Sequence, residues 1–144
     1  MFAANGEYPQ HYNRARSKAS PVVVRRRCIH GNYTALKAVI LDIDRQKAEK
    51  VYCLGDLVGY GPYPNAVVEQ IRSLNIPTVQ GCWDEDIVEG LNACDCSYPS
   101  LLAEKRGKIA HEWTNKEVNP KVRSYLAQLP HTYKDEFRIL YLEN

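Results

Sequence analysis

The stretch Tyr52-Cys53-Leu54-Gly55-Asp56-Leu57-Val58-Gly59-Tyr60-Gly61-Pro62 joins a short apolar run to an acidic, glycine-rich loop. Residues 51–54 are apolar or aromatic and are followed by turn-forming residues, a pattern typical of a buried β-strand. The three glycines permit positive φ and close approach of other backbone segments. Asp56 thus follows the carboxyl end of a strand, where open α/β sheets bind ligands. An aspartate in an ordinary turn is the simpler alternative for Gly55-Asp56 taken alone.

The elements before this loop complete a βαβ unit. Residues 22–29 begin with three valines and predict a strand, and Asn32 is placed as the N-cap of a helix reaching about Lys50. One face of that helix collects apolar residues at helical spacing: Leu36, Val39, Ile40 and Ile43. The crossover between the two strands is expected to be right-handed.

The elements after the loop extend the same alternation. A helix is expected from Asn65, a third strand over 76–80, and Gly81-Cys82-Trp83-Asp84 at the end of that strand. A short helix over 84–91, a loop over 92–100, a helix over 101–118, a helix beginning at Asn119-Pro120 and a last strand over 137–142 follow. We therefore predict an α/β fold in which three strand ends converge on one edge.

Composition indicates one globular domain. The 144 residues are 44% hydrophobic and 25% charged, and no apolar run approaches the length of a membrane span. Residues 1–20 lack the apolar core of a signal peptide, so we expect an intracellular protein, in the cytoplasm or an organelle interior, with no membrane partner. Five cysteines without a secretory signal favour thiols over a disulfide framework.

Charge divides the chain into a basic tail and a mildly acidic body. Residues 1–27 carry six basic side chains and one glutamate, a net charge of +5, whereas the rest carries 13 basic and 16 acidic ones, a net charge of −3. We read residues 1–20 as a flexible tail and 21–144 as the domain. Contact with RNA or an acidic partner is one hypothesis and simple solvation the other. The candidate contact residues are Arg14, Arg16, Lys18, Arg25, Arg26 and Arg27.

The arginine run also lies within the first expected strand. Alternation along a strand sends Arg26 to one face and its two neighbours to the other. Burying guanidinium groups on both faces of a central strand is costly unless each is paired. Either this strand lies at an edge, with the long stems reaching solvent, or anions and acidic partners meet the arginines.

Three motifs taken together resemble a known family. In order along the chain they are Cys28-Ile29-His30-Gly31-Asn32, Gly55 to Pro62, and Gly81-Cys82-Trp83-Asp84. They resemble the first three motifs of the calcineurin-like metallophosphoesterases. Within that superfamily the resemblance is strongest to the small prokaryotic-type phosphodiesterases. The resemblance runs from about Val22 to Leu142. It implies a βαβαβ core of an α/β sandwich, truncated before the second sheet is complete. Either a protein partner covers the incomplete sheet, or the 144 residues are a fragment of a longer gene product.

The resemblance also implies roles for single residues. His30 matches a metal-ligand histidine, Asp56 the aspartate that bridges two metal ions, and Asp84 the carboxylate that orients the catalytic histidine. In the family two ions of the Mn, Fe, Ni or Mg type activate water and stabilise charge on a phosphoester. Here Cys28 replaces a ligand carboxylate and Cys82 a ligand asparagine, while Trp83 replaces the histidine that acts as general acid. Tryptophan has no proton to give near pH 7.

These departures leave three hypotheses. The first is an active two-metal phosphodiesterase or phosphatase. The second, which we favour, is a catalytically lapsed member that serves as a binding or structural module, in a larger assembly that contains RNA. The third is a thiol site in which Cys28 and Cys82, with His30 and Asp56, bind zinc or form a disulfide. Its simpler alternative is that both cysteines fill small semi-buried spaces and bind no metal.

Overall fold

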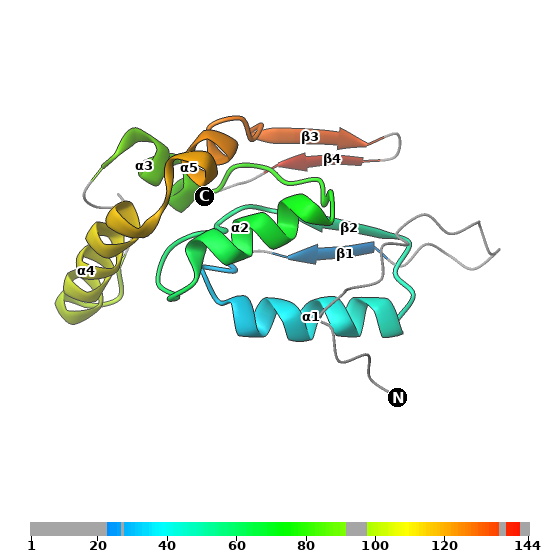
Figure 1. The fold of residues 1–144 in the computed structure, drawn as a ribbon, viewed down its shortest axis with the longest axis horizontal. Coiled ribbons are helices and arrows are strands. Elements are labelled where there is room, and N and C mark those ends of the chain that lie inside the picture. The colour runs from blue at the N-terminus through cyan, green and yellow to red at the C-terminus, as the bar shows by residue number, and fades with distance from the viewer. Residues whose placement is uncertain (1–22, 27, 92–97, 136–137, 142–144) are drawn as a thin grey trace.

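The computed structural model describes residues 23–26, 28–91, 98–135 and 138–141, and these form two two-stranded sheets and five helices (Figure 1). The fold is mixed α/β, as expected. In Figure 1, α1 runs along one side of the first strand pair, and the last three helices gather beyond the carboxyl ends of those strands. That these elements are the first part of a two-sheet sandwich stays a prediction.

The βαβ unit is present. β1 (Val23–Arg26) pairs in parallel with β2 (Lys50–Cys53), and α1 (Tyr33–Arg45) connects them. The expected N-cap is confirmed, because the Asn32 side chain accepts a hydrogen bond from the backbone N–H of Ala35 at 3.0 Å. The helix ends at Arg45 rather than near Lys50, since the chain turns through Lys47, whose φ is +52°.

The third strand is shorter than expected. After α2 (Pro64–Ser73), Thr78 forms a single parallel bridge with Cys53 of β2. Two backbone hydrogen bonds flank it, from Cys53 N to Pro77 O at 2.9 Å and from Val79 N to Cys53 O at 3.1 Å. The segment therefore has the expected place and direction. Pro77 has no N–H to give, which limits the regular ladder to this bridge.

Three helices follow. α3 (Cys82–Glu89) begins two residues before the expected start, so that Cys82, Trp83 and Asp84 form its first turn. α4 (Leu101–Glu117) and α5 (Pro120–Leu126) match the expected helices, and the Asn119 side chain caps α5 by accepting from Val122 N at 2.9 Å. The expected loop over 92–100 lies mostly outside the described residues.

The chain continues into a hairpin of which the sequence predicted only one strand. β3 (Thr132–Asp135) pairs antiparallel with β4 (Arg138–Tyr141). The β3 sequence, with a lysine and an aspartate among four residues, lacks the apolar signature of a buried strand. The Tyr133 ring lies 5.9 Å from that of Tyr52 on β2, which connects the hairpin to the first sheet.

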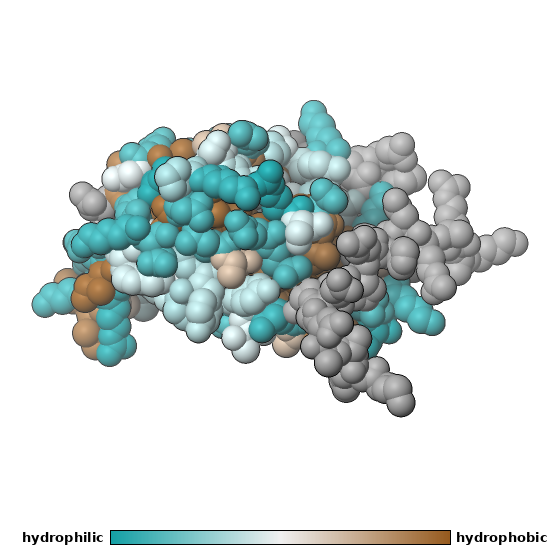
Figure 2. All heavy atoms as spheres, in the orientation of Figure 1, coloured by the Kyte–Doolittle hydropathy of each residue, from teal (hydrophilic) through white to brown (hydrophobic). Residues whose placement is uncertain are grey.

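The core lies between β2 and the helices that surround it. Its fully buried side chains come from the loop after β2 and from α2, α3 and α5: Leu57, Val58, Val67, Val68, Ile71, Ile87, Val122 and Leu126. The face in Figure 2 is largely hydrophilic, and α4 exposes Leu101, Leu102 and Ile109. Among the described residues no helix is both long and apolar enough to cross a membrane.

Candidate metal centre

The loops that follow β1 and β2 are joined by backbone hydrogen bonds. His30 N donates to Asp56 O and Gly31 N to Leu57 O, both at 2.8 Å, and Gly61 N donates to His30 O at 2.6 Å. A Cβ atom on Gly31 would lie 2.5 Å from Gly61 O, and one on Gly61 would lie 2.4 Å from His30 O. The glycines of both motifs are therefore required for this close approach.

Three of the predicted metal ligands have an unusual backbone. Cys28, His30 and Asp56 have φ values of +57°, +46° and +54°, in the left-handed region that side chains other than glycine seldom adopt. Each residue held in this backbone conformation costs about 1–3 kcal/mol of folding stability, and such residues cluster at functional sites. The loops thus turn these three side chains toward one point at some cost in stability.

The same three residues form the candidate metal centre. One ligand atom each from Cys28, His30 and Asp56 lies within 4.8 Å of the other two. The Cys28 thiol is 3.8 Å from Asp56 Oδ2, and His30 Nδ1 is 3.0 Å from the carbonyl oxygen of Val58. Because a carbonyl can only accept, this contact requires a proton on Nδ1, so Nε2 is the atom of the neutral ring that can offer a lone pair to a metal ion.

The fourth predicted ligand, Cys82, lies on the other side of the carboxylate. Its thiol donates to Asp56 Oδ1 at 3.7 Å, and the same oxygen accepts from Trp83 N at 3.3 Å. Burial, and then the charge of Asp56, raise the pKa of the Cys82 thiol to about 11. Cys82 therefore carries its proton at neutral pH. It contacts the centre through Asp56 without belonging to the group of converging ligand atoms.

Trp83 occupies the middle of the site. Its side chain is only 3% exposed, and its ring centroid lies 4.6 Å from that of Tyr60, 5.6 Å from that of His30 and 5.0 Å from that of His111. The indole ring therefore fills the space between these three side chains. Tyr60 covers the tryptophan from outside and is itself half exposed.

Asp84 is fully buried and connects α3 to the loop after β2. Its Oδ1 accepts from Leu57 N at 2.9 Å and from Val58 N at 3.2 Å, and its Oδ2 accepts from Gly81 N at 3.1 Å. Burial raises the pKa of this carboxyl to about 7, although the three N–H donors act in the opposite direction. The contacts give Asp84 a positioning role, and its part in catalysis stays a prediction.

His111 is a buried residue of the site that the sequence reading did not assign to it. Its Nε2 lies 3.6 Å from Asp86 Oδ2, and neither atom has a hydrogen-bond partner among the described residues. Burial lowers the pKa of His111, while the charge of Asp86 opposes that shift. Helical spacing could have found it, because His111 falls between Gly107 and Thr114 on the buried face of α4.

The predicted contacts of the basic segment remain predictions. Arg25 and Arg26 belong to β1, but their side chains lie outside the described residues, as do Arg27 and the basic residues of the tail. Cys28, Cys53 and Cys82, the three cysteines within the described part of the chain, carry thiols rather than disulfides.

Comparison with known proteins finds relatives of this fold. No protein-family model matches the chain. An uncharacterized protein of Methanocaldococcus jannaschii, MJ0912, is 40% identical over 102 residues, which are 71% of this chain and 39% of that protein. The crystal structure of a metallophosphoesterase from Sphaerobacter thermophilus matches 81% of this chain with a TM-score of 0.59 and 29% identity. Over that part, the chain is related to the calcineurin-like metallophosphoesterases.

A second solved structure gives the same result. The hypothetical protein PH1004 from Pyrococcus horikoshii OT3 matches 80% of this metallophosphoesterase-like chain with a TM-score of 0.62 and 28% identity. The chain covers 44% of the Sphaerobacter protein and 49% of PH1004. It therefore spans less than half the length of the relatives that it matches.

Proposed function

We propose that this chain is a metallophosphoesterase-like binding module that holds one divalent cation of the zinc class and has lost phosphoester hydrolysis. The observation that carries the proposal is the convergence of Cys28, His30 and Asp56, whose ligand atoms lie within 4.8 Å of one another. Thiolate, imidazole and carboxylate together are a donor set that zinc accepts.

The donor set fits the family's pair of hard cations poorly. Divalent metal use is implied by the metallophosphoesterase neighbours. Two such ions need several carboxylates and imidazoles. This site offers one carboxylate in the converging group, and Cys82 keeps its proton on the other side of Asp56. One softer cation suits these residues better than two hard ones.

Loss of hydrolysis is supported by Trp83. It stands where the family's proton donor is expected, and its buried ring packs against His30, Tyr60 and His111. An indole N–H does not titrate near neutral pH and cannot protonate a leaving oxygen. A zinc ion at the three ligands would supply a structural link between the loops after β1 and β2.

The first test is metal binding. Protein loaded with Zn²⁺ or Co²⁺ and then desalted should retain about one ion per chain, and the Co²⁺ form should show a thiolate charge-transfer band. His30→Ala and Asp56→Asn should lose the ion, and Cys28→Ser should lose the band. His131→Ala is the matched control, because His131 is exposed and outside the site. Full retention of metal by His30→Ala would contradict the proposed centre.

The second test is hydrolysis. Turnover of bis(p-nitrophenyl) phosphate with Mn²⁺, Mg²⁺ or Zn²⁺ should equal that of the His30→Ala and Asp56→Asn variants. Metal-dependent turnover that disappears in both variants would show an active two-metal phosphodiesterase instead. Metal retention and turnover are separate readouts, so the two halves of the proposal can fail independently.

A role in a larger assembly is supported only by charge. Six basic residues among the first 27 give that segment a net charge of +5. We expect the full chain to bind single-stranded RNA with an affinity that falls steeply with salt. Fluorescence anisotropy with a labelled oligonucleotide measures this, and a chain lacking residues 1–20 that binds equally well would refute a contact through Arg14, Arg16 and Lys18.

A further inference from the structure

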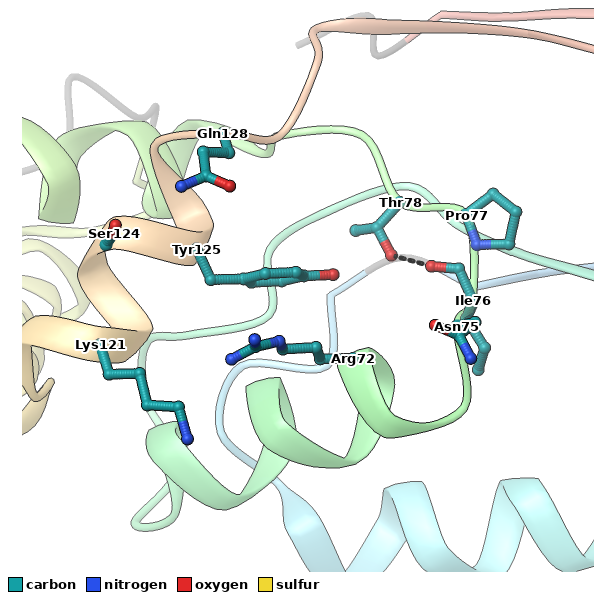
Figure 3. Close-up of a pocket in the computed structure, with 9 residues that line it drawn as sticks. All are labelled: Arg72, Asn75, Ile76, Pro77, Thr78, Lys121, Ser124, Tyr125 and Gln128. Carbon is teal, nitrogen blue, oxygen red and sulfur yellow. Dashed lines mark hydrogen bonds between the residues drawn. The ribbon is translucent and has the colours of Figure 1, made fainter. Parts of the chain in front are cut away.

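A second candidate site lies away from the metal centre. A hollow of about 640 Å³ opens between the carboxyl end of α2 and the helix α5, and the segment 75–78 forms its far side (Figure 3). Pockets that bind small molecules have volumes of this order. Arg72 lies eight residues after Pro64, so it is about 12 Å along α2 from the glycine loop of the metal centre.

The hollow is cationic. Arg72 and Lys121 reach it from α2 and α5, and no aspartate or glutamate is among its lining residues. In the described part of the chain, no carboxylate lies within ion-pair distance of Arg72. Lys121 Nζ lies 3.8 Å from Glu69 Oε1, and both side chains are largely exposed, so this contact holds the lysine loosely.

Tyr125 lies beside the arginine. The Arg72 guanidinium lies over the tyrosine ring, with Cζ 5.9 Å from the ring centroid (Figure 3). A cation–π contact at this distance is weak and leaves the guanidinium N–H groups available to a ligand. The amides of Asn75 and Gln128 add neutral donors around the same space.

We propose that this hollow binds a phosphate group, either free phosphate or a phosphate monoester. A planar arginine with a second cation and neutral amide donors is the set that recognises phosphate oxygens. The proposal is independent of the metal centre, because none of the residues it uses belongs to that centre. A simpler alternative is that Arg72 only packs on Tyr125, and the experiment separates the two.

The experiment is a titration of ¹⁵N-labelled full chain with sodium phosphate, followed by NMR in EDTA at constant ionic strength. Amides of residues 72–78 and 121–128 should shift and saturate. Arg72→Gln and Lys121→Gln should each raise the Kd about tenfold, the loss of one charged hydrogen bond. Glu69→Gln should lower the Kd because it removes the competitor for Lys121. Arg106→Gln, an exposed arginine of α4, and His30→Ala should leave the Kd unchanged.

Titrations with adenosine monophosphate and with adenosine distinguish a phosphate monoester from free phosphate as the ligand. Tighter binding of the nucleotide than of phosphate, with no binding of adenosine, indicates a monoester; the reverse order indicates free phosphate. Shifts that stay linear, or equal Kd values in Arg72→Gln and Arg106→Gln, would overturn the proposal. Loss of binding in His30→Ala alone would place the phosphate at the metal centre and overturn it as well. Lys121 is exposed, so its variant tests the site without risk to the fold.

Discussion

Asp56 is the residue on which the candidate centre depends. Its two carboxylate oxygens receive the thiols of Cys28 and Cys82 at 3.8 and 3.7 Å, and its backbone carbonyl receives the N–H of His30. Thiols are weak hydrogen-bond donors, so the main compensation of the carboxylate is the backbone N–H of Trp83, which donates to Oδ1 at 3.3 Å. A cation that displaces the Cys28 proton would therefore find a ligand ready to bind it.

The variant Trp83→Ala tests whether packing of the indole ring stabilises the site. We expect Trp83→Ala to lower the free energy of unfolding by about 3–5 kcal/mol, because it removes a buried ring and leaves a cavity. Trp113→Ala is the matched control: Trp113 is 39% exposed on α4, and its loss should cost less than about 1 kcal/mol. Urea denaturation measures both, and similar costs would contradict the packing role.

Asp84 should make stability depend on pH. Its ordinary pKa of 3.8 rises to about 7 in the folded chain. Between about pH 4 and pH 7 the unfolded chain has lost this proton while the folded chain retains it, so the free energy of unfolding falls as the pH rises through that window. Asp84→Asn cannot titrate and should show a shallower fall.

The comparison is made in EDTA by urea denaturation at several pH values. A constant difference between the two proteins is also expected, because the asparagine amide cannot accept the Gly81 N–H that Asp84 Oδ2 accepts. If the two pH profiles run parallel, the carboxyl is ionised throughout and the raised pKa is wrong.

At the scale of helices and strands, the sequence predicted those features that depend on a few neighbouring residues. Asn32 and Asn119 begin their helices as expected, because an N-cap depends on the capping side chain and the next three residues. The third strand was expected at its observed place but with a longer ladder, and β3 was not expected, since the extent of strand pairing depends on contacts distant in sequence. Of the candidate site, the glycine loops and the approach of Cys28 and Cys82 to Asp56 were expected, whereas His111 is brought in only by the docking of α4.

The close approach of α3 to the loop after β2 depends on the absence of a side chain at Gly81. A Cβ atom on Gly81 would lie 2.2 Å from Asp56 N and 2.4 Å from Asp56 Oδ1. Gly81→Ala should therefore push α3 away and destabilise the chain by about 1–3 kcal/mol or more. Gly90→Ala separates this clash from backbone strain, because Gly90 has φ +70° and a Cβ atom added there would meet no other atom within 4 Å, so its cost is about 1 kcal/mol. Equal costs in urea denaturation would show that α3 yields without strain.

For the whole molecule, the two proposed sites sit on different parts of the same small scaffold. The metal centre links the loops that follow the parallel strands, and the phosphate hollow links α2 to α5. Both join segments distant in sequence, so a ligand at either one should stabilise the folded chain as a unit. Hydrogen exchange distinguishes the two sites, because removal of a ligand should lower the protection of the amides around its own site.

Zinc should raise the thermal stability of the full chain and slow hydrogen exchange in a defined place. At a free Zn²⁺ concentration 100 times the Kd, the gain is about 2.7 kcal/mol, reduced by any zinc that the unfolded cysteines bind. The amides of His30 and Gly31, which donate across the two loops, should exchange more slowly with zinc, whereas those of α4 should change less. EDTA should reverse both effects and His30→Ala should abolish them, with His131→Ala behaving as the native chain. Protection that rises equally in α4 and in the loops would mean that zinc acts elsewhere, because a link between the loops after β1 and β2 acts first on the hydrogen bonds that join them.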